Sequence, residues 1–434
     1  MVIILVKKIT ARIEYTMNLV FSEVMGINYS ITTNPHEFQS SKEQKINYSG
    51  IEVRGCLSIE PSDLLFESEL VNRKIETGEW KKTPTIFSNN QESIPFDIFA
   101  AIFYLVTRYE EYLSSESDQY GRFEADQSIA LKSNFLHIPV VDIWCQQLAR
   151  ELSILKYCKL LKTSNYAFTL TVDIDHAWMI RYRGMIRNIA KLVRELILLR
   201  LQEFKFKLYV LRNKTNDPGD SYNLLEKTQN RLAQQIKYFI LSGGNHKYDT
   251  NISIDHKRFQ TLIRNLDKHK SVGLHPSFAS NKSIEMLREE HEDLSAIVER
   301  PVEISRQHYL ILSLPETYRK LIKLGIKEDH TMGYGTRTGF RAGIARSFYF
   351  YDLYEEKQTS LRVFPFQVMD RTLNSSLNHS PDEAIKEFKY YGDIIRSVGG
   401  HFIALWHNTS LNDTYEWKGW RRVFEEMISM NEQI

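Results

Sequence analysis

The chain has 434 residues, of which 42% are hydrophobic and 25% charged, a composition typical of soluble globular proteins. Its 56 Lys and Arg nearly balance its 54 Asp and Glu, so the net charge of +2 argues against a strongly basic nucleic-acid-binding protein. The length predicts two domains, and no apolar run is long enough to span a membrane.

The N-terminal stretch MVIILVKKITARIEY has only a short apolar run before Lys7 and Lys8, and it lacks the cleavage site of a signal peptide. We therefore expect a first strand there. The chain has three cysteines, Cys56, Cys145 and Cys158, without CxxC spacing, so neither a disulfide framework nor a zinc–thiolate site is indicated. Together these features lead us to expect a cytoplasmic protein.

Residues 1–160 are predicted to form a smaller α/β accessory domain. Its apolar segments predict strands at 2–6, 51–59 and 85–87 and helices at 98–113 and 140–155. The charged residues of the first helix, Arg108, Glu110 and Glu111, are expected on its solvated face.

A basic helical insertion is predicted at about 181–230. Between residues 181 and 214 there are ten Lys and Arg against two Glu, with apolar residues at helical spacing. We expect the apolar stripe to pack on the domain and the basic face to lie in solvent. The alternatives are peripheral contact with an anionic membrane through 181–214, or binding of an anionic polymer.

Residues 161–434 alternate strand and helix patterns, which predicts parallel β-strands with crossover helices in a barrel or a doubly wound sheet. The first strand of this part is the alternating run at 168–173. Further strands are predicted at 238–241, 271–274, 302–304, 331–340, 363–369 and 401–406. Helices are predicted at 258–268, 284–297, 315–324, 348–354 and 382–398.

Several of these strands end in residues that bind metals or move protons. Two carboxylates follow the first strand in FTLTVDIDHAW, and further polar residues follow later strands. The set is Asp173, Asp175, His275, Arg306, His308, Asp370 and His407, with Arg341 in a glycine-rich loop. Because the carboxyl ends of parallel strands open onto one face, we expect these residues to meet there. Oxygen and imidazole ligands without thiolate suit zinc or a similar divalent ion, whereas a simple turn closing each strand is the structural alternative.

No nucleotide-binding or serine-hydrolase motif competes with this interpretation, because the chain lacks a Walker A loop, a GxGxxG after a strand and a GxSxG elbow.

Over residues 165–411 the sequence resembles the NodB-type polysaccharide deacetylases (carbohydrate esterase family four), in particular the bacterial subgroup with an additional N-terminal α/β domain. The resemblance is carried, in order, by TVDIDHA, VGLHPS, SRQH and the Leu-x-His of LWH. It implies a distorted (β/α)7 TIM-like barrel, one divalent metal ion, and hydrolysis of an N-acetyl group from a sugar.

Two positions depart from the family pattern. Ile174 separates the two aspartates that are adjacent in the family, and Ala279 occupies the position of the usual second metal histidine. We expect His308 to supply the third ligand because its strand neighbours that of His275. His330 is the weaker candidate.

The resemblance implies the following roles. Asp175, His275 and His308 would hold the ion, most simply Zn²⁺. Asp173 would be the general base, oriented by Arg306, and His407 the general acid. Arg341 and Asp370 are expected to contact the substrate, an N-acetylated sugar of a surface polysaccharide or its precursor. Two alternatives stay open: an inactive binding or assembly component of polysaccharide biosynthesis, and a related barrel amidohydrolase that cleaves another non-peptide C–N bond.

Overall fold

The computed structural model describes residues 1–91, 93–154, 166–232, 235–243 and 247–432. The predicted boundary near residue 160, the end of the helix predicted at 140–155, and Cys158 lie outside the described residues. Cys56 is a free, half-buried thiol, and Cys145 is buried. None of the described helices is long and apolar enough to cross a bilayer.

The N-terminal unit is built on a parallel four-stranded sheet in the order β2-β1-β3-β4. The strands are β1 (Val2–Val6), β2 (Tyr29–Thr32), β3 (Gln44–Tyr48) and β4 (Leu57–Ser58). The strand predicted at 51–59 is largely wrong, because Gly50 and Gly55 both have a φ of 77° and turn the chain there. The segment predicted at 85–87 belongs to a separate antiparallel hairpin of β5 (Thr77–Trp80) and β6 (Thr83–Ile86).

The described part of this unit also contains the α-helices α1 (Ala11–Met17), α2 (Pro35–Ser40), α3 (Ile98–Val106), α4 (Tyr109–Leu113), α5 (Ile129–Lys132) and α6 (Val140–Glu151). Every residue of α3 is buried, and the Asp97 side chain accepts a hydrogen bond from Ala100 N at 3.0 Å to cap its first turn. The predicted helix 98–113 is broken between α3 and α4 because Arg108 adopts a left-handed conformation.

The second unit contains a nine-stranded sheet in the order β12-β13-β11-β10-β9-β8-β7-β15-β14. Its strands are β7 (Ala167–Ile174), β8 (Ile236–Leu241), β9 (Val272–His275), β10 (Ile304–Ser305), β11 (Glu328–Asp329), β12 (Phe348–Asp352), β13 (Lys357–Val363), β14 (Val368–Met369) and β15 (His401–His407). All neighbours are parallel except β12 and β13.

This sheet is open. Among the described residues its two edge strands, β12 and β14, do not pair with each other. One edge is an antiparallel hairpin strand, and the other is only two residues long. The predicted α/β class with a parallel sheet is confirmed, but the predicted closed (β/α)7 barrel is not observed.

Two local predictions in this unit are also wrong. Residues 348–354 were expected to form a helix, but Phe348–Asp352 is β12, whose consecutive aromatic residues favour a strand. The strand expected at 331–340 is a loop.

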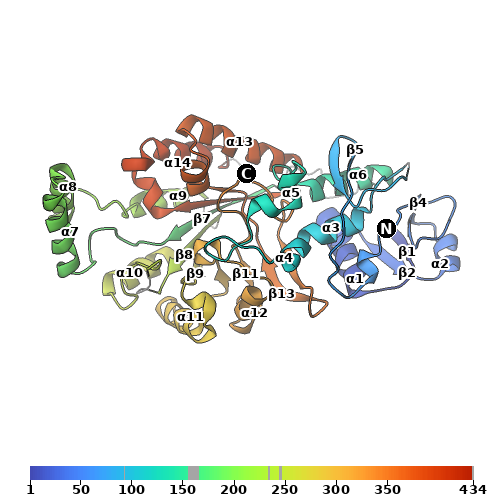
Figure 1. Ribbon diagram of the computed structural model, residues 1–434, viewed down its shortest axis with the longest axis horizontal. Helices are drawn as coiled ribbons and strands as arrows, with labels where there is room; N and C mark the ends of the chain where they lie inside the picture. The colour runs from blue at the N-terminus through green and yellow to red at the C-terminus, as the bar shows by residue number, and fades with distance from the viewer. Residues whose placement is uncertain (92, 155–165, 233–234, 244–246, 433–434) are drawn as a thin grey trace.

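Among the described residues, the second sheet is accompanied by the α-helices α7 (Met185–Ile197), α8 (Leu201–Leu211), α9 (Tyr222–Leu232), α10 (Lys257–Leu266), α11 (Ile284–Val298), α12 (Glu316–Lys323), α13 (Pro381–Ser397) and α14 (Trp420–Ser429). In Figure 1, α13 and α14 lie on one side of the sheet and α10, α11 and α12 on the other. The α7–α8 hairpin stands at the end of the molecule opposite the N-terminal unit.

The two units share one continuous hydrophobic core and are joined by buried ion pairs. Arg12 pairs with Glu356 at 2.5 Å, and Glu111 pairs with Arg341 at 2.7 Å. The predicted solvated face of the helix at 98–113 is therefore wrong: Arg108 is 1% exposed and lies between Glu110 and Glu111. These charges are buried because the second unit covers them.

The basic insertion forms the α7–α8 hairpin, as its helical periodicity predicts. The expectation that its apolar stripe packs on the domain is wrong, because Ile186 is 85% exposed and Leu199 is 82% exposed. The hairpin projects from the body instead of lying along it (Figure 1), so its outer apolar side chains have no protein surface to contact.

Candidate metal centre

The predicted site residues meet because their strands are neighbours in one parallel sheet. β7 lies between β15 and β8, and β9 follows β8. The register places His407 beside Asp173 and His275 beside Leu241. All these strands end in the same direction, so Asp173, Asp175, His275 and His407 lie at one edge of the sheet. The short turn after β10 brings His308 to the same edge.

Asp175, His275 and His308 form a compact group of potential metal ligands. One ligand atom from each lies within 4.8 Å of the other two. Asp175 Oδ1 is 3.2 Å from His275 Nε2 and 3.7 Å from His308 Nε2. This oxygen is buried and accepts no hydrogen bond of good geometry from the described residues. A buried carboxylate oxygen facing two imidazole nitrogens without a hydrogen bond is well suited to coordinate a cation, so these residues fit a divalent metal ion.

The two histidines of this group are oriented by partners on their other ring nitrogen. His275 Nδ1 is 2.5 Å from the Arg306 carbonyl oxygen, and His308 Nδ1 is 2.9 Å from Asp249 Oδ1. Because both partners only accept hydrogen bonds, both Nδ1 atoms must donate. When the imidazoles are neutral, each Nε2 carries the lone pair and faces Asp175, which is the arrangement of metal-binding histidines.

Asp173 is held beside this group by Arg306. The Arg306 Nη1 donates to Asp173 Oδ1 at 2.9 Å, and its Nε donates to the His330 carbonyl oxygen at 2.9 Å. The other carboxylate oxygen, Oδ2, is 3.7 Å from His275 Nε2. Oδ1 of Asp173 therefore accepts a hydrogen bond from the Arg306 guanidinium, and Oδ2 faces the candidate metal centre.

His407 approaches the centre from another side. Its Nδ1 lies 2.8 Å from Asp370 Oδ1, and its Nε2 lies 3.8 Å from Asp175 Oδ2. Asp370 also accepts from His407 N at 2.8 Å and from the Ser410 hydroxyl. The two ligand histidines thus face Oδ1 of Asp175, whereas His407 faces Oδ2.

The electrostatics of the group favour opposite charges. Burial opposes ionisation of Asp175, but His308, His275 and His407 together hold the pKa of this carboxyl well below its usual value. Burial also opposes protonation of His407, but Asp370 and Asp175 outweigh it and raise the pKa of this imidazole. A histidine with a raised pKa between two carboxylates is a suitable proton donor.

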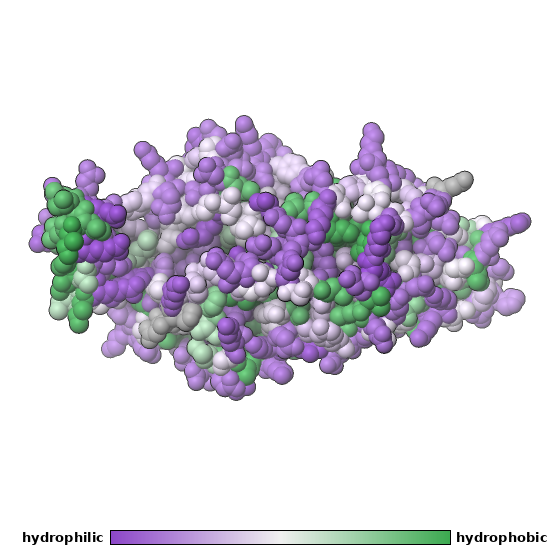
Figure 2. All heavy atoms as spheres, viewed as in Figure 1, coloured by the Kyte–Doolittle hydropathy of each residue, from purple (hydrophilic) through white to green (hydrophobic). Residues whose placement is uncertain are grey.

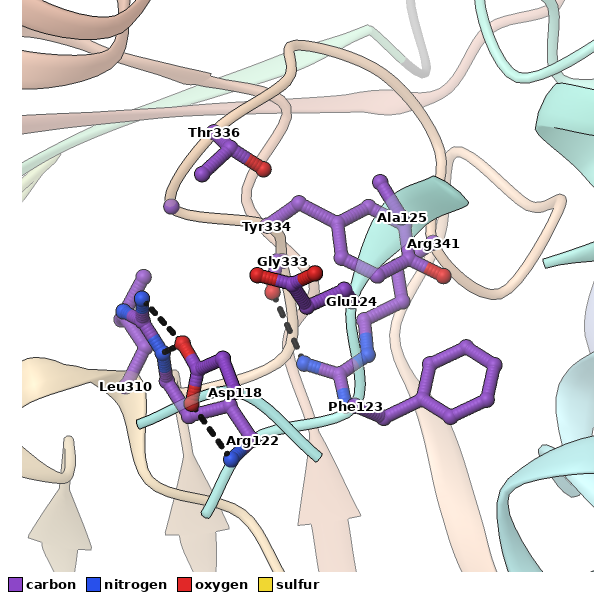
Figure 3. Close-up of a pocket in the computed structure, with 11 residues that line it drawn as sticks. Asp118, Arg122, Phe123, Glu124, Ala125, Leu310, Gly333, Tyr334, Thr336 and Arg341 are labelled. Atoms are coloured by element: carbon purple, nitrogen blue, oxygen red, sulfur yellow. Dashed lines mark hydrogen bonds and ion pairs between the residues drawn. The ribbon is translucent and has the colours of Figure 1, made fainter. Parts of the chain in front are cut away.

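The two residues expected to contact substrate are engaged in other interactions. Asp370 is fully buried and holds His407, so we assign it a positioning role. Arg341 is bonded to Glu111 and donates from Nη1 to the Gly333 carbonyl oxygen at 2.9 Å. Figure 3 shows its guanidinium directed at Gly333, in a small pocket that also contains the Asp118–Arg122 pair. Arg341 therefore lies at the contact between the two units and does not approach Asp175.

The weaker ligand candidate His330 lies outside the group. It is buried, stacks on Phe364 with ring centroids 4.8 Å apart, and burial lowers its pKa to about 3. Ala279 also supplies no side-chain ligand. Its backbone N donates to Asp249 Oδ2 at 3.3 Å, next to the bond from Phe278 N to Asp249 Oδ1 at 2.8 Å. The loop after β9 thus binds the residue that orients His308.

Asp249, which follows β8, is a site residue that was not expected from the sequence. Its only signal in the sequence is an additional carboxylate after a strand.

The N-terminal unit also contributes residues beside the site, which was not expected from the sequence. Tyr120 packs on Tyr309, with ring centroids 5.1 Å apart, and Tyr309 follows His308 directly. Arg122 Nη1 donates to the Tyr309 carbonyl oxygen at 2.9 Å. Tyr248 and Phe278 complete a partly exposed aromatic cluster with these two tyrosines.

A family model matches residues 2–156, and its description is a family of unknown function (DUF7033). No curated protein matches the chain. One similar solved structure is the Puue allantoinase, at 11% identity over 62% of this chain and 86% of its own, with a TM-score of 0.39. A second is a probable polysaccharide deacetylase from Pseudomonas aeruginosa PAO1, at 12% identity over 61% and 84%, also with a TM-score of 0.39. A polysaccharide deacetylase from Bacillus cereus is 12% identical over 61% and 85%, with a TM-score of 0.29.

Proposed function

We propose that this protein is a metal-dependent hydrolase that removes an N-acetyl group from a sugar of a surface polysaccharide or its precursor. The observation that carries the proposal is the meeting of Asp175, His275 and His308 with Asp173 on one side and His407 on the other. Metal-assisted hydrolysis of an amide requires ligands for the ion, a general base for the attacking water and a general acid for the departing amine. These residues would supply all three. We infer the function from these residues and their geometry.

The ligand group supports a single divalent ion. A donor set of one carboxylate and two imidazoles, with no thiolate, is common for catalytic Zn²⁺ and leaves further coordination positions for water and substrate. When bound, the ion would supply Lewis-acid activation of the amide carbonyl and of a water molecule.

The protein's own residues would move the protons. Asp173 accepts a proton from the attacking water through the oxygen that Arg306 does not engage. His407, which Asp370 holds through Nδ1, donates a proton from Nε2 to the departing amine. An amine cannot leave a tetrahedral carbon as an anion, so a proton donor at this position is essential for cleavage of the C–N bond.

The partly exposed aromatic cluster supports a saccharide substrate. Tyr309 contacts His308, Tyr120, Tyr248 and Phe278 pack against Tyr309, and three of the four rings carry hydroxyl groups. Flat rings with a polar edge suit the apolar face and hydroxyl rim of a sugar ring. Tyr120 belongs to the N-terminal unit, so we infer that this unit takes part in substrate binding. We predict that Tyr120→Ala raises KM and lowers kcat much less; an unchanged KM would remove Tyr120 from the binding surface.

The inactive alternative is less well supported. It rested on Ala279, which leaves the family's second histidine position without a ligand. In the structure His308 completes the group from the neighbouring strand, so the loss at position 279 leaves no gap in the ligand set.

The decisive experiment measures metal content and acetate release on the same preparation. Protein loaded with Zn²⁺ is assayed for bound metal and for acetate released from a panel of N-acetylated mono- and oligosaccharides, with a cyclic ureide as the competing substrate class. We expect one ion per chain and acetate release. Asp175→Ala, His275→Ala and His308→Ala should each lose the metal, whereas the exposed His269→Ala control should keep it.

Stoichiometric metal without acetate release from any sugar, or turnover of the ureide alone, would contradict the proposed substrate. Absence of bound metal in the loaded protein would contradict the centre itself.

A further inference from the structure

The α7–α8 hairpin carries a concentrated apolar surface. Half of the large hydrophobic side chains that are exposed among the described residues lie between Met185 and Tyr209. They are Met185, Ile186, Ile189, Val193, Leu196, Ile197, Leu198, Leu199, Leu201 and Tyr209. Figure 2 shows this surface on the outward side of the hairpin, with hydrophilic side chains between it and the body of the molecule. An exposed apolar patch of this density indicates a binding surface.

The charge around this surface is almost entirely positive. The two acidic residues of the segment are engaged internally: Glu195 pairs with Lys207 at 2.6 Å, and Glu203 accepts from the Tyr415 hydroxyl at 2.8 Å. The other nine Lys and Arg of residues 181–214 are left without a carboxylate of this segment. Burial lowers the pKa of Lys191 to about 8, and the neighbouring Arg183 and Arg187 lower it further.

The hairpin is firmly attached to the edge of the sheet that carries the candidate metal centre. The buried Asp217 accepts hydrogen bonds from the backbone N of Met179, Ile180 and Arg181 at 2.7–2.9 Å. Arg181 Nη2 donates to the Thr215 carbonyl oxygen at 2.8 Å. These bonds join the entry and exit of the hairpin, so its outer surface has a defined orientation relative to β7.

We propose that the α7–α8 hairpin is a docking surface for an anionic lipid bilayer. Its apolar side chains enter the headgroup region while the flanking Lys and Arg bind lipid phosphates, as in interfacial amphipathic helices. Neither helix is long and apolar enough to span the bilayer, so both lie on its surface. In Figure 1 the hairpin stands across the end of the molecule, which lets both helices meet one plane.

Charge favours this occupant over a second copy of the chain. An isologous dimer through the hairpin would bring the same cations against each other, without free carboxylates of the hairpin to compensate them. An anionic bilayer supplies both the apolar phase and the opposite charge. The proposal is independent of the hydrolytic chemistry proposed above.

Co-sedimentation of the full-length protein with vesicles tests the proposal. One vesicle population contains phosphatidylcholine alone, and the other contains equal parts of phosphatidylcholine and phosphatidylglycerol, at low and high salt. We expect binding to the anionic vesicles that weakens with salt and little binding to the neutral ones. The double variant Arg187→Glu/Arg194→Glu should weaken binding at low salt by about 30-fold or more.

A second pair of variants tests how much the apolar side chains of the hairpin contribute to vesicle binding. Ile186→Asp/Leu199→Asp should weaken binding by more than about tenfold at either salt concentration. Ile51→Asp is the matched control, because Ile51 is 52% exposed and belongs to the N-terminal unit, which lies at the opposite end of the molecule from the hairpin (Figure 1). Circular dichroism and thermal unfolding verify that each variant is folded, and light scattering reports self-association.

Failure of the wild-type protein to bind anionic vesicles would overturn the proposal. The proposal would also be overturned if the hairpin variants bound anionic vesicles as tightly as the wild type and the Ile51→Asp control. Light scattering that shows a dimer lost in Ile186→Asp/Leu199→Asp, together with no vesicle binding, would assign the surface to a second copy instead.

Discussion

Asp249 offers the sharpest test of the candidate metal centre because it acts on the metal only through His308. Its Oδ1 accepts from His308 Nδ1 at 2.9 Å and from Phe278 N at 2.8 Å, and its Oδ2 accepts from Ala279 N at 3.3 Å. The Asp249→Asn variant keeps the shape of the side chain and one accepting oxygen. It loses the negative charge that strengthens His308 as a ligand and places an amide donor opposite Ala279 N.

Removal of such an outer partner lowers metal affinity by about 10- to 100-fold. That change corresponds to about 1.4–2.7 kcal/mol of binding free energy. The dissociation constant for Zn²⁺ is measured by competition with a chromophoric chelator, and circular dichroism verifies the fold. His308→Ala should weaken binding further because it removes the ligand itself.

Asp370→Asn is the matched control. This carboxylate holds His407 as Asp249 holds His308, but His407 is not in the ligand group. Its zinc affinity should therefore stay at the wild-type value. Our assignment of the ligands is refuted if Asp249→Asn binds Zn²⁺ as tightly as the wild type, or if Asp370→Asn weakens binding by the same factor.

Three further predictions concern catalysis and stability. His407→Ala should lower acetate release by about 10²- to 10⁴-fold with zinc content unchanged, and near-normal turnover would remove His407 from the mechanism. Glu111→Ala leaves the buried Arg341 without its carboxylate and should reduce the free energy of unfolding in urea by about 3–5 kcal/mol; a loss below about 1 kcal/mol would contradict the importance of this pair. Burial lowers the pKa of His330 to about 3 from 6.5, so as pH falls below 6.5 the unfolded chain binds a proton that the folded chain does not. Between pH 6.5 and pH 3, this histidine therefore lowers the free energy of unfolding by up to about 1.4 kcal/mol for each pH unit that the pH falls. His330→Gln should make the measured pH dependence less steep by that amount. An unchanged slope would show that His330 is not buried as a neutral group.

The local pattern was sufficient to identify β7 and the polar residues that follow it. Phe168, Leu170 and Val172 alternate with polar residues, and such a period of two is a property of adjacent positions that needs no knowledge of the rest of the chain. The same local logic predicted helices in the basic insertion. It failed for Phe348–Asp352, where the strand is stabilised by pairing with β13, a partner that the segment itself does not reveal.

The candidate site was predictable as a set of residue types but not as a set of roles. Asp370 and His308 are both polar residues that follow a predicted strand, and the sequence gives no further information on which group each of them contacts. Only their surroundings distinguish a carboxylate that holds His407 from a histidine that faces Asp175. Likewise, nothing near Arg341 in the chain indicates that Glu111, from the other unit, neutralises it.

Residue type, spacing and periodicity along the chain were thus enough to predict an α/β protein with a metal-binding set of Asp and His at strand ends. The order of strands, the orienting role of Asp249, the pairing of Arg341 with Glu111 and the exposure of the hairpin depend on tertiary structure. The reason is physical: ligand geometry and burial are set by distances between segments far apart in the sequence, and those distances exist only once β7, β9, β10 and β15 pack into one sheet.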